Sequence, residues 1–260
     1  ATFEAYVRSW TVVLAILCGL LVLLGVYHVR ALPAGGGAAE RHSLRDGLSG
    51  LKEVVGAFFQ KKHIWYYLGF IILYRLGEGF VMKIVPLFLK ADTASGGLGL
   101  TNQQIGLYYG TFGAGAFLLG SLLAGYYIAH RGLRRTLFIL CCIFNIPFAV
   151  YALLAWLQPQ SMWIVGGGIV LEYFGYGFGF VGLTLFMMQQ VAPGRHQMAH
   201  YAFASGIMNL SVMLTGAVSG YLSDALGYGM FFLAVMLATV PAFLVTWFVP
   251  FTYDDKPNDK

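Results

Sequence analysis

The chain has 260 residues, of which 58% are hydrophobic and only 10% are charged, and its formal net charge is +5 at pH 7. Soluble domains carry about 25% charged residues. The composition therefore excludes an ordinary soluble globular protein and indicates a membrane protein.

Seven apolar segments are each long enough to cross a bilayer, because about 20 helical residues span its ~30 Å hydrocarbon core. We expect an all-α membrane protein with transmembrane helices over 9–29, 64–89, 103–129, 136–157, 162–190, 201–222 and 229–250. The first of these is long for a signal sequence and lacks a small-residue cleavage site. Because the chain starts with Ala1 and not with Met, we expect that an N-terminal part of the protein is missing.

The segment 30–63 predicts a cytoplasmic linker between the first helix and the rest. It begins with a Pro/Gly/Ala stretch at 33–39, and Ser43 with Asp46 forms a helix-capping signal. An amphipathic helix is expected to follow on the membrane surface. Its apolar stripe consists of Leu44, Leu48, Leu51, Val55 and Phe58.

The second apolar segment, 64–89, carries charged residues at a depth where each costs about 2.5–3.5 kcal/mol to insert. Arg75 and Glu78 are three residues apart, so they share a helix face and can form an ion pair. A structural pair that fixes helix packing is one interpretation. The other is a functional site in which Arg75 captures an anion and Glu78 exchanges a proton. Lys83 lies nearer the outer interface, where it either snorkels or contacts a solute.

The fifth apolar segment, 162–190, contains a second buried carboxylate, Glu172, at a depth close to that of Glu78. No basic residue lies within one turn of Glu172, so its partner comes from another helix or it is protonated at rest. Proton coupling and a neutral packing role are both open. The aromatic residues around it mostly pack, although Tyr173 and Tyr176 can stack on a sugar or a base.

Other polar residues give weaker signals. Asn209 lies in the middle of its segment and is a candidate for solute binding. Arg195, His196 and His200 are expected in a solvated cytoplasmic loop. The sequence shows no metal-ligand spacing, so we expect no metal and no cofactor. It also has no phosphate-binding loop, which argues against a primary pump with its motor in this chain. No nucleic-acid partner is expected.

Basic residues gather on one set of alternate loops, which the positive-inside rule places in the cytoplasm. They are Arg30, Arg41, Arg45, Lys52, Lys61, Lys62, Arg131, Arg134, Arg135, Arg195, Lys256 and Lys260. The opposite loops hold Arg8 and Lys90. We therefore expect the N-terminus of this chain outside and the C-terminus in the cytoplasm, where residues 251–260 form a disordered tail.

The six segments after the linker divide three and three. Gly125-Tyr126 is followed at plus seven by Gly132, and Gly220-Tyr221 is followed at plus seven by Gly227. Inverted three-helix repeats are building units of secondary transporters. We expect 64–250 to form one six-helix transporter domain.

The loop GYYIAHRGLR from Gly125 to Arg134 resembles the G-x-x-x-D-R-x-G-R-[RK] pattern of the major facilitator superfamily, with Ala129 and His130 departing from it. A closer likeness is to the muropeptide permease group, which also resembles acetyl-CoA transporters. It rests on LYRLGEGFVMKIVPLFL (73–89), HYAFASGIMN (200–209), GAVSGYL (216–222) and LGY (226–228).

This resemblance implies the sixth to twelfth helices of a twelve-helix secondary transporter in a bacterial inner membrane. Arg75 would bind an anionic group of the solute, and Glu78 and Glu172 would carry the coupled proton. The further candidates for solute contacts are Tyr74, Lys83, Tyr173, Tyr176 and Asn209. The implied partners are a small-molecule solute, a proton, the lipid bilayer and the missing N-terminal half.

A seven-helix membrane receptor is the alternative, because it has the same helix count and an external N-terminus. The internal repeat and the long linker argue against it. A membrane enzyme is disfavoured because no nucleophile and base lie together in the sequence.

Overall fold

The computed structural model describes residues 3–32 and 44–253, with side chains over 3–32 and 50–253. The described residues form helices joined by short loops and contain no strand. The chain divides into two units, Ala1–Leu48 and Ser49–Lys260. The expected Pro/Gly/Ala linker at 33–39, the capping residue Ser43 and residues 254–260 of the expected tail at 251–260 lie outside the described residues. Residues 251–253 of that tail are described, and the backbone amides of Thr252 and Tyr253 donate to the Gln190 Oε1 over 2.8 and 3.1 Å.

The first unit contains α1 (Phe3–Ala31), a 29-residue helix that is about 43 Å long at 1.5 Å per residue. None of its side chains is buried within the unit. The predicted helix over 9–29 is therefore confirmed and extends further at both ends.

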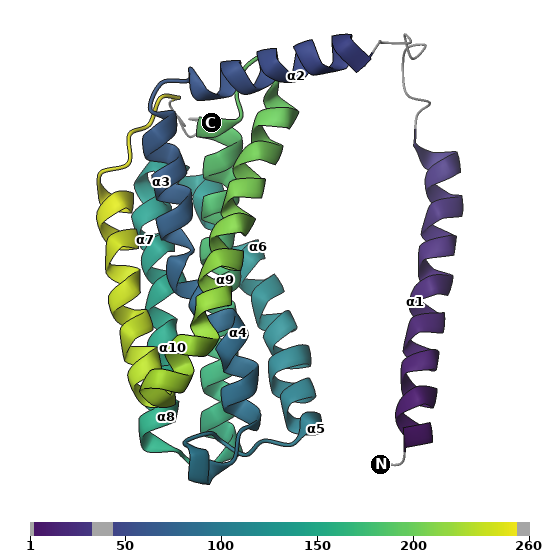
Figure 1. The fold of residues 1–260 in the computed structure, drawn as a ribbon, viewed down its shortest axis with the longest axis vertical. Helices are drawn as coiled ribbons and strands as arrows, with labels where there is room; N and C mark the ends of the chain where they lie inside the picture. The colour runs from purple at the N-terminus through teal and green to yellow at the C-terminus, as the bar shows by residue number, and fades with distance from the viewer. Residues whose placement is uncertain (1–2, 33–43, 254–260) are drawn as a thin grey trace. The chain divides into compact units, whose positions relative to one another are not determined.

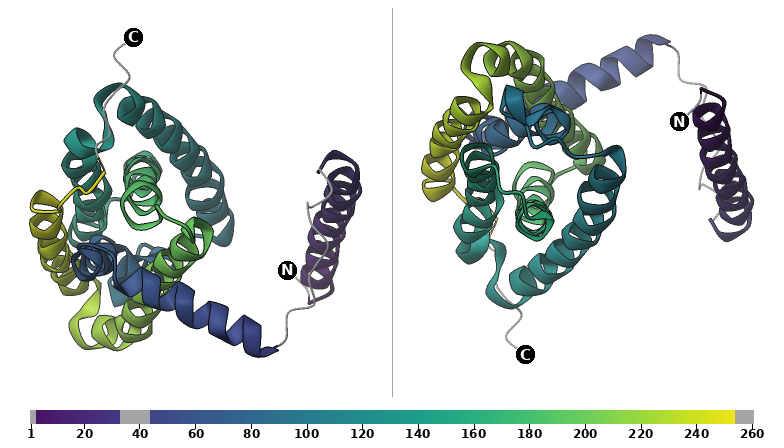
Figure 2. Two further views of the ribbon diagram at one scale, coloured as in Figure 1. Left: turned by 90° about the horizontal axis from the view of Figure 1, so that it is seen from above. Right: turned by 90° about the horizontal axis from the view of Figure 1, so that it is seen from below.

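The second unit is a bundle of helices in which α9 packs against α6, α7 and α8. Viewed from above, α9 lies inside a ring of the other helices (Figure 2). The helices drawn in Figure 1 after α1 are α2 (Leu44–Phe59), which belongs to this unit from Ser49 onward, α3 (Ile64–Tyr74), α4 (Leu76–Lys90), α5 (Asn102–Ile105), α6 (Gly113–Arg131), α7 (Leu133–Asn145), α8 (Ala149–Leu157), α9 (Met162–Phe186) and α10 (Gln197–Trp247). Short 3-10 segments lie at Thr93–Ser95 and Ile146–Phe148, and π-helical turns form η2 (Gly106–Phe112) and η4 (Met187–Val191).

The segment 64–89 is not one continuous helix. Arg75 has φ −100° and ψ 8°, which ends α3 and starts α4. The backbone amide of Gly79 donates to the Arg75 carbonyl over 3.0 Å, so the second helix starts at once. The break places the Arg75 side chain at the junction of two helices.

Two glycines with positive φ mark reversals of the chain. Gly132 joins α6 to α7 with φ 76° and ψ 148°, and Gly227 interrupts α10 with φ 71° and ψ 162°. Residues with a side chain rarely adopt this conformation. Figure 1 shows that the green and yellow parts of α10 on either side of this break run in opposite directions.

Five described helices are long and apolar enough to cross a membrane, against the seven expected. They are Phe3–Ala31, Asn102–Arg131, Leu133–Leu157, Met162–Val191 and Gln197–Trp247. The difference has two structural causes. The expected segment 64–89 is divided at Arg75, and the last two expected segments fall within α10.

Close contact between α6 and α9 depends on glycine. A Cβ added at Gly120 would meet the carbonyl of Phe174, and one added at Gly177 would meet the carbonyl of Phe117. The two backbones therefore approach more closely than any larger residue would allow.

A helix, α2, is present where the sequence predicts a surface helix, and its C-terminal half packs against α10. Phe58 is fully buried, and its ring contacts those of His200 and Phe203. Leu51 of the same apolar stripe remains exposed.

Further contacts connect α2 to the loop before α10. Arg195 and His196 lie 3.2 and 3.6 Å from the Glu53 carboxylate, and the His200 Nε2 lies 3.1 Å from the Val54 carbonyl oxygen. The expectation of a solvated loop is wrong for His200, which is buried because α2 covers it.

Lys61 connects the turn after α2 to the end of η4. Its Nζ donates to the carbonyl oxygens of Val191, Ala192 and Pro193 over 2.6, 3.1 and 2.6 Å. Partial burial lowers the pKa of Lys61 from its ordinary value. An ammonium group at this place satisfies carbonyls left without partners at a helix C-terminus.

Candidate functional site

The helix break at Arg75 places a charged pair inside the bundle. The Arg75 guanidinium donates from Nε and Nη2 to the two carboxylate oxygens of Glu78. Both residues are only 4% exposed. The pairing expected from their spacing is present, and its bidentate form is the strongest arrangement for an arginine with a carboxylate.

The helix α9 forms the wall facing this pair. The Arg75 Cζ lies 5.3 Å from the centre of the Phe180 ring. Tyr176 is close enough to interact with both Arg75 and Glu78. The hydroxyl of Tyr74 donates to the Gly179 carbonyl over 3.0 Å, which joins α3 to α9 directly.

Glu172 lies on α9 and is 6% exposed. The hydroxyl of Tyr151, on α8, donates to its Oε2 over 2.8 Å. Glu172 is also close enough to Glu78 for the two carboxyl groups to interact electrostatically. The partner that the sequence left open is therefore a neutral hydroxyl from another helix.

Two further tyrosines border Glu172. The rings of Tyr109 in η2 and Tyr173 in α9 meet edge to face with centres 4.9 Å apart. Both interact electrostatically with Glu172. Tyr109 is held in a π-helical turn, a local distortion that is common at functional sites.

The structure thus brings together six of the eight candidate residues. These are Tyr74, Arg75, Glu78, Glu172, Tyr173 and Tyr176. Lys83 and Asn209 are both exposed and lie outside this cluster. Lys83 lines a groove of about 380 Å³ between α4 and α10, together with Asp224.

Tyr109 and Tyr151 were missed by the sequence analysis. Tyr151 lies in a segment without any charged residue, so nothing near it in the chain indicates a polar partner. For Tyr109 a weak signal existed, because it belongs to a Gly-Leu-Tyr-Tyr-Gly stretch that breaks the regular helix.

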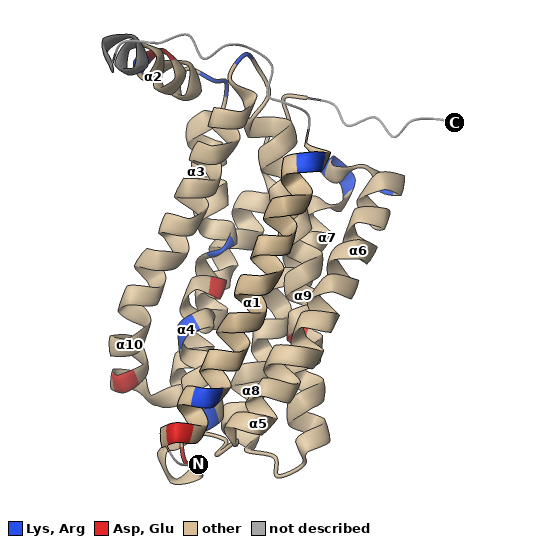
Figure 3. Cartoon of the chain, turned by 90° about the vertical axis from the view of Figure 1, so that its right-hand side faces the viewer, with Lys and Arg blue, Asp and Glu red and all other residues tan. Residues whose placement is uncertain are grey.

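The charged residues of this unit are concentrated at its ends, and only a few lie along the middle of its helices (Figure 3). Among the described residues, no three His, Cys, Asp or Glu side chains are placed to hold a metal ion.

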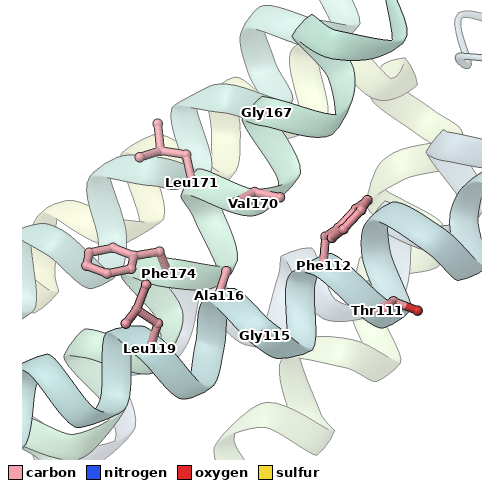
Figure 4. Close-up of a pocket in the computed structure, with 9 residues that line it drawn as sticks. All are labelled: Thr111, Phe112, Gly115, Ala116, Leu119, Gly167, Val170, Leu171 and Phe174. Carbon is pink, nitrogen blue, oxygen red and sulfur yellow. The ribbon is translucent and has the colours of Figure 1, made fainter.

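The groove of about 540 Å³ between α6 and α9 is lined almost entirely by apolar atoms, as the side chains of Leu119, Leu171 and Phe174 illustrate (Figure 4). Thr111 contributes a hydroxyl group to this groove, but no charged side chain is among its lining residues.

Residues 71–260, which include every residue of the cluster, match the pattern of the Major Facilitator Superfamily. The chain belongs to this superfamily. The resemblance seen in the sequence is thereby confirmed, and the family favours a transporter over both the seven-helix receptor and a membrane enzyme.

Curated relatives extend this assignment at low identity. The chain is 26% identical over 188 residues to the anhydromuropeptide permease of Escherichia coli (strain K12), covering 72% of this chain and 37% of the permease. It is 24% identical over 195 residues to the putative transporter AmpG 2 of Rickettsia bellii, covering 74% and 46%. With AmpG 2 of Rickettsia felis the identity is 27% over 203 residues, covering 74% and 45%. The chain spans between about a third and a half of the length of these relatives.

Proposed function

We propose that this chain forms one half of a proton-coupled symporter for an anionic, sugar-containing cell-wall solute of the anhydro-muropeptide class. The observation that carries the proposal is the buried bidentate pair of Arg75 and Glu78, with a second buried carboxylate, Glu172, close by. Intramembrane charges are costly and are kept mainly where they act on a solute or an ion.

The Arg75–Glu78 pair can couple an anion to a proton. While Glu78 is ionised, it occupies two donors of the Arg75 guanidinium. Protonation of Glu78 removes that charge and frees Arg75 for an anionic group of the solute. Proton and anion then favour each other's binding, because linkage between two ligands is reciprocal.

Glu172 provides a second proton-accepting group on the helix that faces the pair. Its hydrogen bond from Tyr151 stabilises the ionised form, while its burial favours the neutral form. Opposing effects of this kind suit a carboxyl group that must both load and release a proton during each cycle.

The class of solute comes from the relatives, among them a permease named for anhydro-muropeptides. Tyr173, Tyr176 and Tyr74 would contact sugar rings beside Arg75. Lys83 and Asn209 are exposed in this half, and we propose that they face the solute from the surface that the other half covers.

The proposed architecture is a 3+3 inverted repeat over 64–250, preceded by one helix, which gives seven helices in this chain. Its support is the shared conformation of Gly132 and Gly227 at matched positions. The chain's coverage of its relatives supports a second, N-terminal half that forms the facing wall of the cavity. We propose that the N-terminus lies outside and the C-terminus in the cytoplasm of a bacterial inner membrane, because the positive-inside rule assigns the basic loops of the sequence to the cytoplasm.

The test is uptake of labelled anhydro-muropeptide into right-side-out vesicles containing this chain joined to its N-terminal half. We expect an inward proton gradient to drive accumulation. Glu78→Gln should retain binding but lose accumulation, and Arg75→Gln should lose binding. Arg195→Gln, which alters an exposed ion pair, is the matched control. Accumulation that does not depend on the proton gradient would contradict the coupling. A failure of the unsubstituted transporter to bind the solute would contradict the solute class.

A further inference from the structure

Tyr151, on α8, contacts residues of two other helices, α9 and α10. It is fully buried on α8, and its hydroxyl donates to the Glu172 Oε2 on α9 over 2.8 Å. Its ring is stacked on that of Phe232 in the second part of α10, with centres 5.7 Å apart and planes at 30°. The ring contact therefore fixes where the hydroxyl points.

The aromatic contacts continue from Phe232 to the helix that carries Glu78. The ring of Phe232 meets that of Phe88 in α4 edge to face, with centres 5.1 Å apart. Phe88 and Phe232 are buried as well. A continuous row of three rings thus runs from α4, through α10, to the hydroxyl that contacts Glu172. Packed rings of this kind move together because the interior leaves no free space.

We propose that Tyr151 is a positioning residue for Glu172, whose hydrogen bond favours the ionised form of the carboxylate when α4 and α10 are in the position seen here. A shift of α4 or α10 moves the Tyr151 hydroxyl away and favours protonation of Glu172. The transport movement and the proton are thereby connected through one hydrogen bond. This inference rests on the proposed function, in which Glu172 carries a proton.

The other groups around Glu172 do not replace this hydroxyl. Tyr109 from η2 and Tyr173 and Tyr176 from α9 all interact with Glu172 electrostatically, but among the described residues the hydrogen bond to its carboxylate comes from Tyr151. Glu78 from α4 adds negative charge, which favours the neutral form of Glu172. Arg75 is engaged with Glu78. Loss of the Tyr151 hydroxyl thus removes the main stabilisation of the Glu172 anion.

The experiment measures gradient-driven uptake against external pH for the complete transporter and four variants. Tyr151→Phe keeps the ring on Phe232 and removes only the donor. We expect the pH of half-maximal uptake to move upward by about one unit, because a lost donor to the ionised form raises the pH at which the carboxyl group takes up its proton. Phe232→Leu keeps the hydroxyl but loosens the ring, so a smaller upward shift is expected.

The matched control is Tyr66→Phe, since the Tyr66 hydroxyl also donates to a single acceptor, the Val245 carbonyl at 2.9 Å, away from the cluster. It should leave the pH of half-maximal uptake unchanged. Glu172→Gln should abolish the pH dependence and so tests the proposed function itself. The inference would be overturned if Tyr151→Phe and Phe232→Leu both leave the pH profile unshifted while Glu172→Gln loses its pH dependence. That combination would leave the proposed function intact. A normal pH dependence in Glu172→Gln would remove the proposed role of Glu172 and the inference with it.

Discussion

Arg75 donates to both carboxylate oxygens of Glu78, and each of the two residues is only 4% exposed. Removing one partner leaves the other charge buried without compensation. We therefore predict that Arg75→Gln destabilises the protein by about 3–5 kcal/mol at neutral pH. Thermal unfolding in detergent measures this loss.

The double variant Arg75→Gln/Glu78→Gln should recover much of that stability, because it leaves no unpaired charge. Arg195→Gln removes an exposed ion pair with Glu53 and should change stability by less than about 1 kcal/mol. Equal losses in the buried and the exposed pair would show that burial does not determine the strength of the Arg75–Glu78 interaction.

Substitution of Gly120 tests whether the protein's stability depends on the close approach of α6 and α9. A methyl group there would collide with the backbone carbonyl of Phe174, which cannot move away without shifting α9. We predict that Gly120→Ala destabilises the protein by about 1–3 kcal/mol. Gly115→Ala, on the same helix, meets no atom within 4 Å and should be neutral or slightly stabilising. The melting temperatures of the two variants show whether the collision at Gly120 costs stability.

Substitution of Gly227 tests whether the chain reverses its direction within α10. With φ at 71° and no atom within 4 Å of an added Cβ, the cost of Gly227→Ala is backbone strain alone. Such strain is worth about 1–3 kcal/mol. Gly220→Ala is the control, because that helical position is equally open and has no positive φ. A Gly227→Ala variant as stable as Gly220→Ala would argue that α10 continues without a reversal.

Substitution of Lys61 tests whether its hydrogen bonds stabilise the connection between the turn after α2 and the end of η4. Its ammonium group donates to three successive carbonyls, so Lys61→Met should loosen residues 187–196 by about 1 kcal/mol, or about fivefold in local opening. Hydrogen exchange of these amides is the measurement. Lys62→Met, at an exposed neighbouring position, should leave the exchange rates unchanged.

Much of this site could be predicted from the sequence because buried charge is rare and costly. Arg75, Glu78 and Glu172 are conspicuous in apolar segments. The spacing of Arg75 and Glu78 indicated an ion pair, and the depth of Glu172 was expected to be close to that of Glu78. The helix break at Arg75 could not be predicted in the same way. It depends on the neighbours that hold Arg75 between two helices, and a hydropathy pattern shows only that the segment is apolar.

The residues that were missed or misplaced depend on contacts between segments far apart in the chain. Tyr151 acquires its partner only when α8 packs beside α9, and an apolar segment with one tyrosine gives no sign of that. The burial of His200 depends on α2 lying over it. Lys83 and Asn209 lie on exposed faces of their helices, and their contact with a solute stays a prediction. The repeat around Gly132 and Gly227 was suggested by the sequence and remains a proposal.

Proton movement that accompanies the solute tests the central claim most directly. Anhydro-muropeptide is added to de-energised vesicles containing the complete transporter in a weakly buffered medium, and the external pH is recorded. The account predicts that the medium becomes more alkaline as solute enters, and that Glu172→Gln abolishes this change. Solute entry with no change in external pH would contradict proton coupling through this cluster.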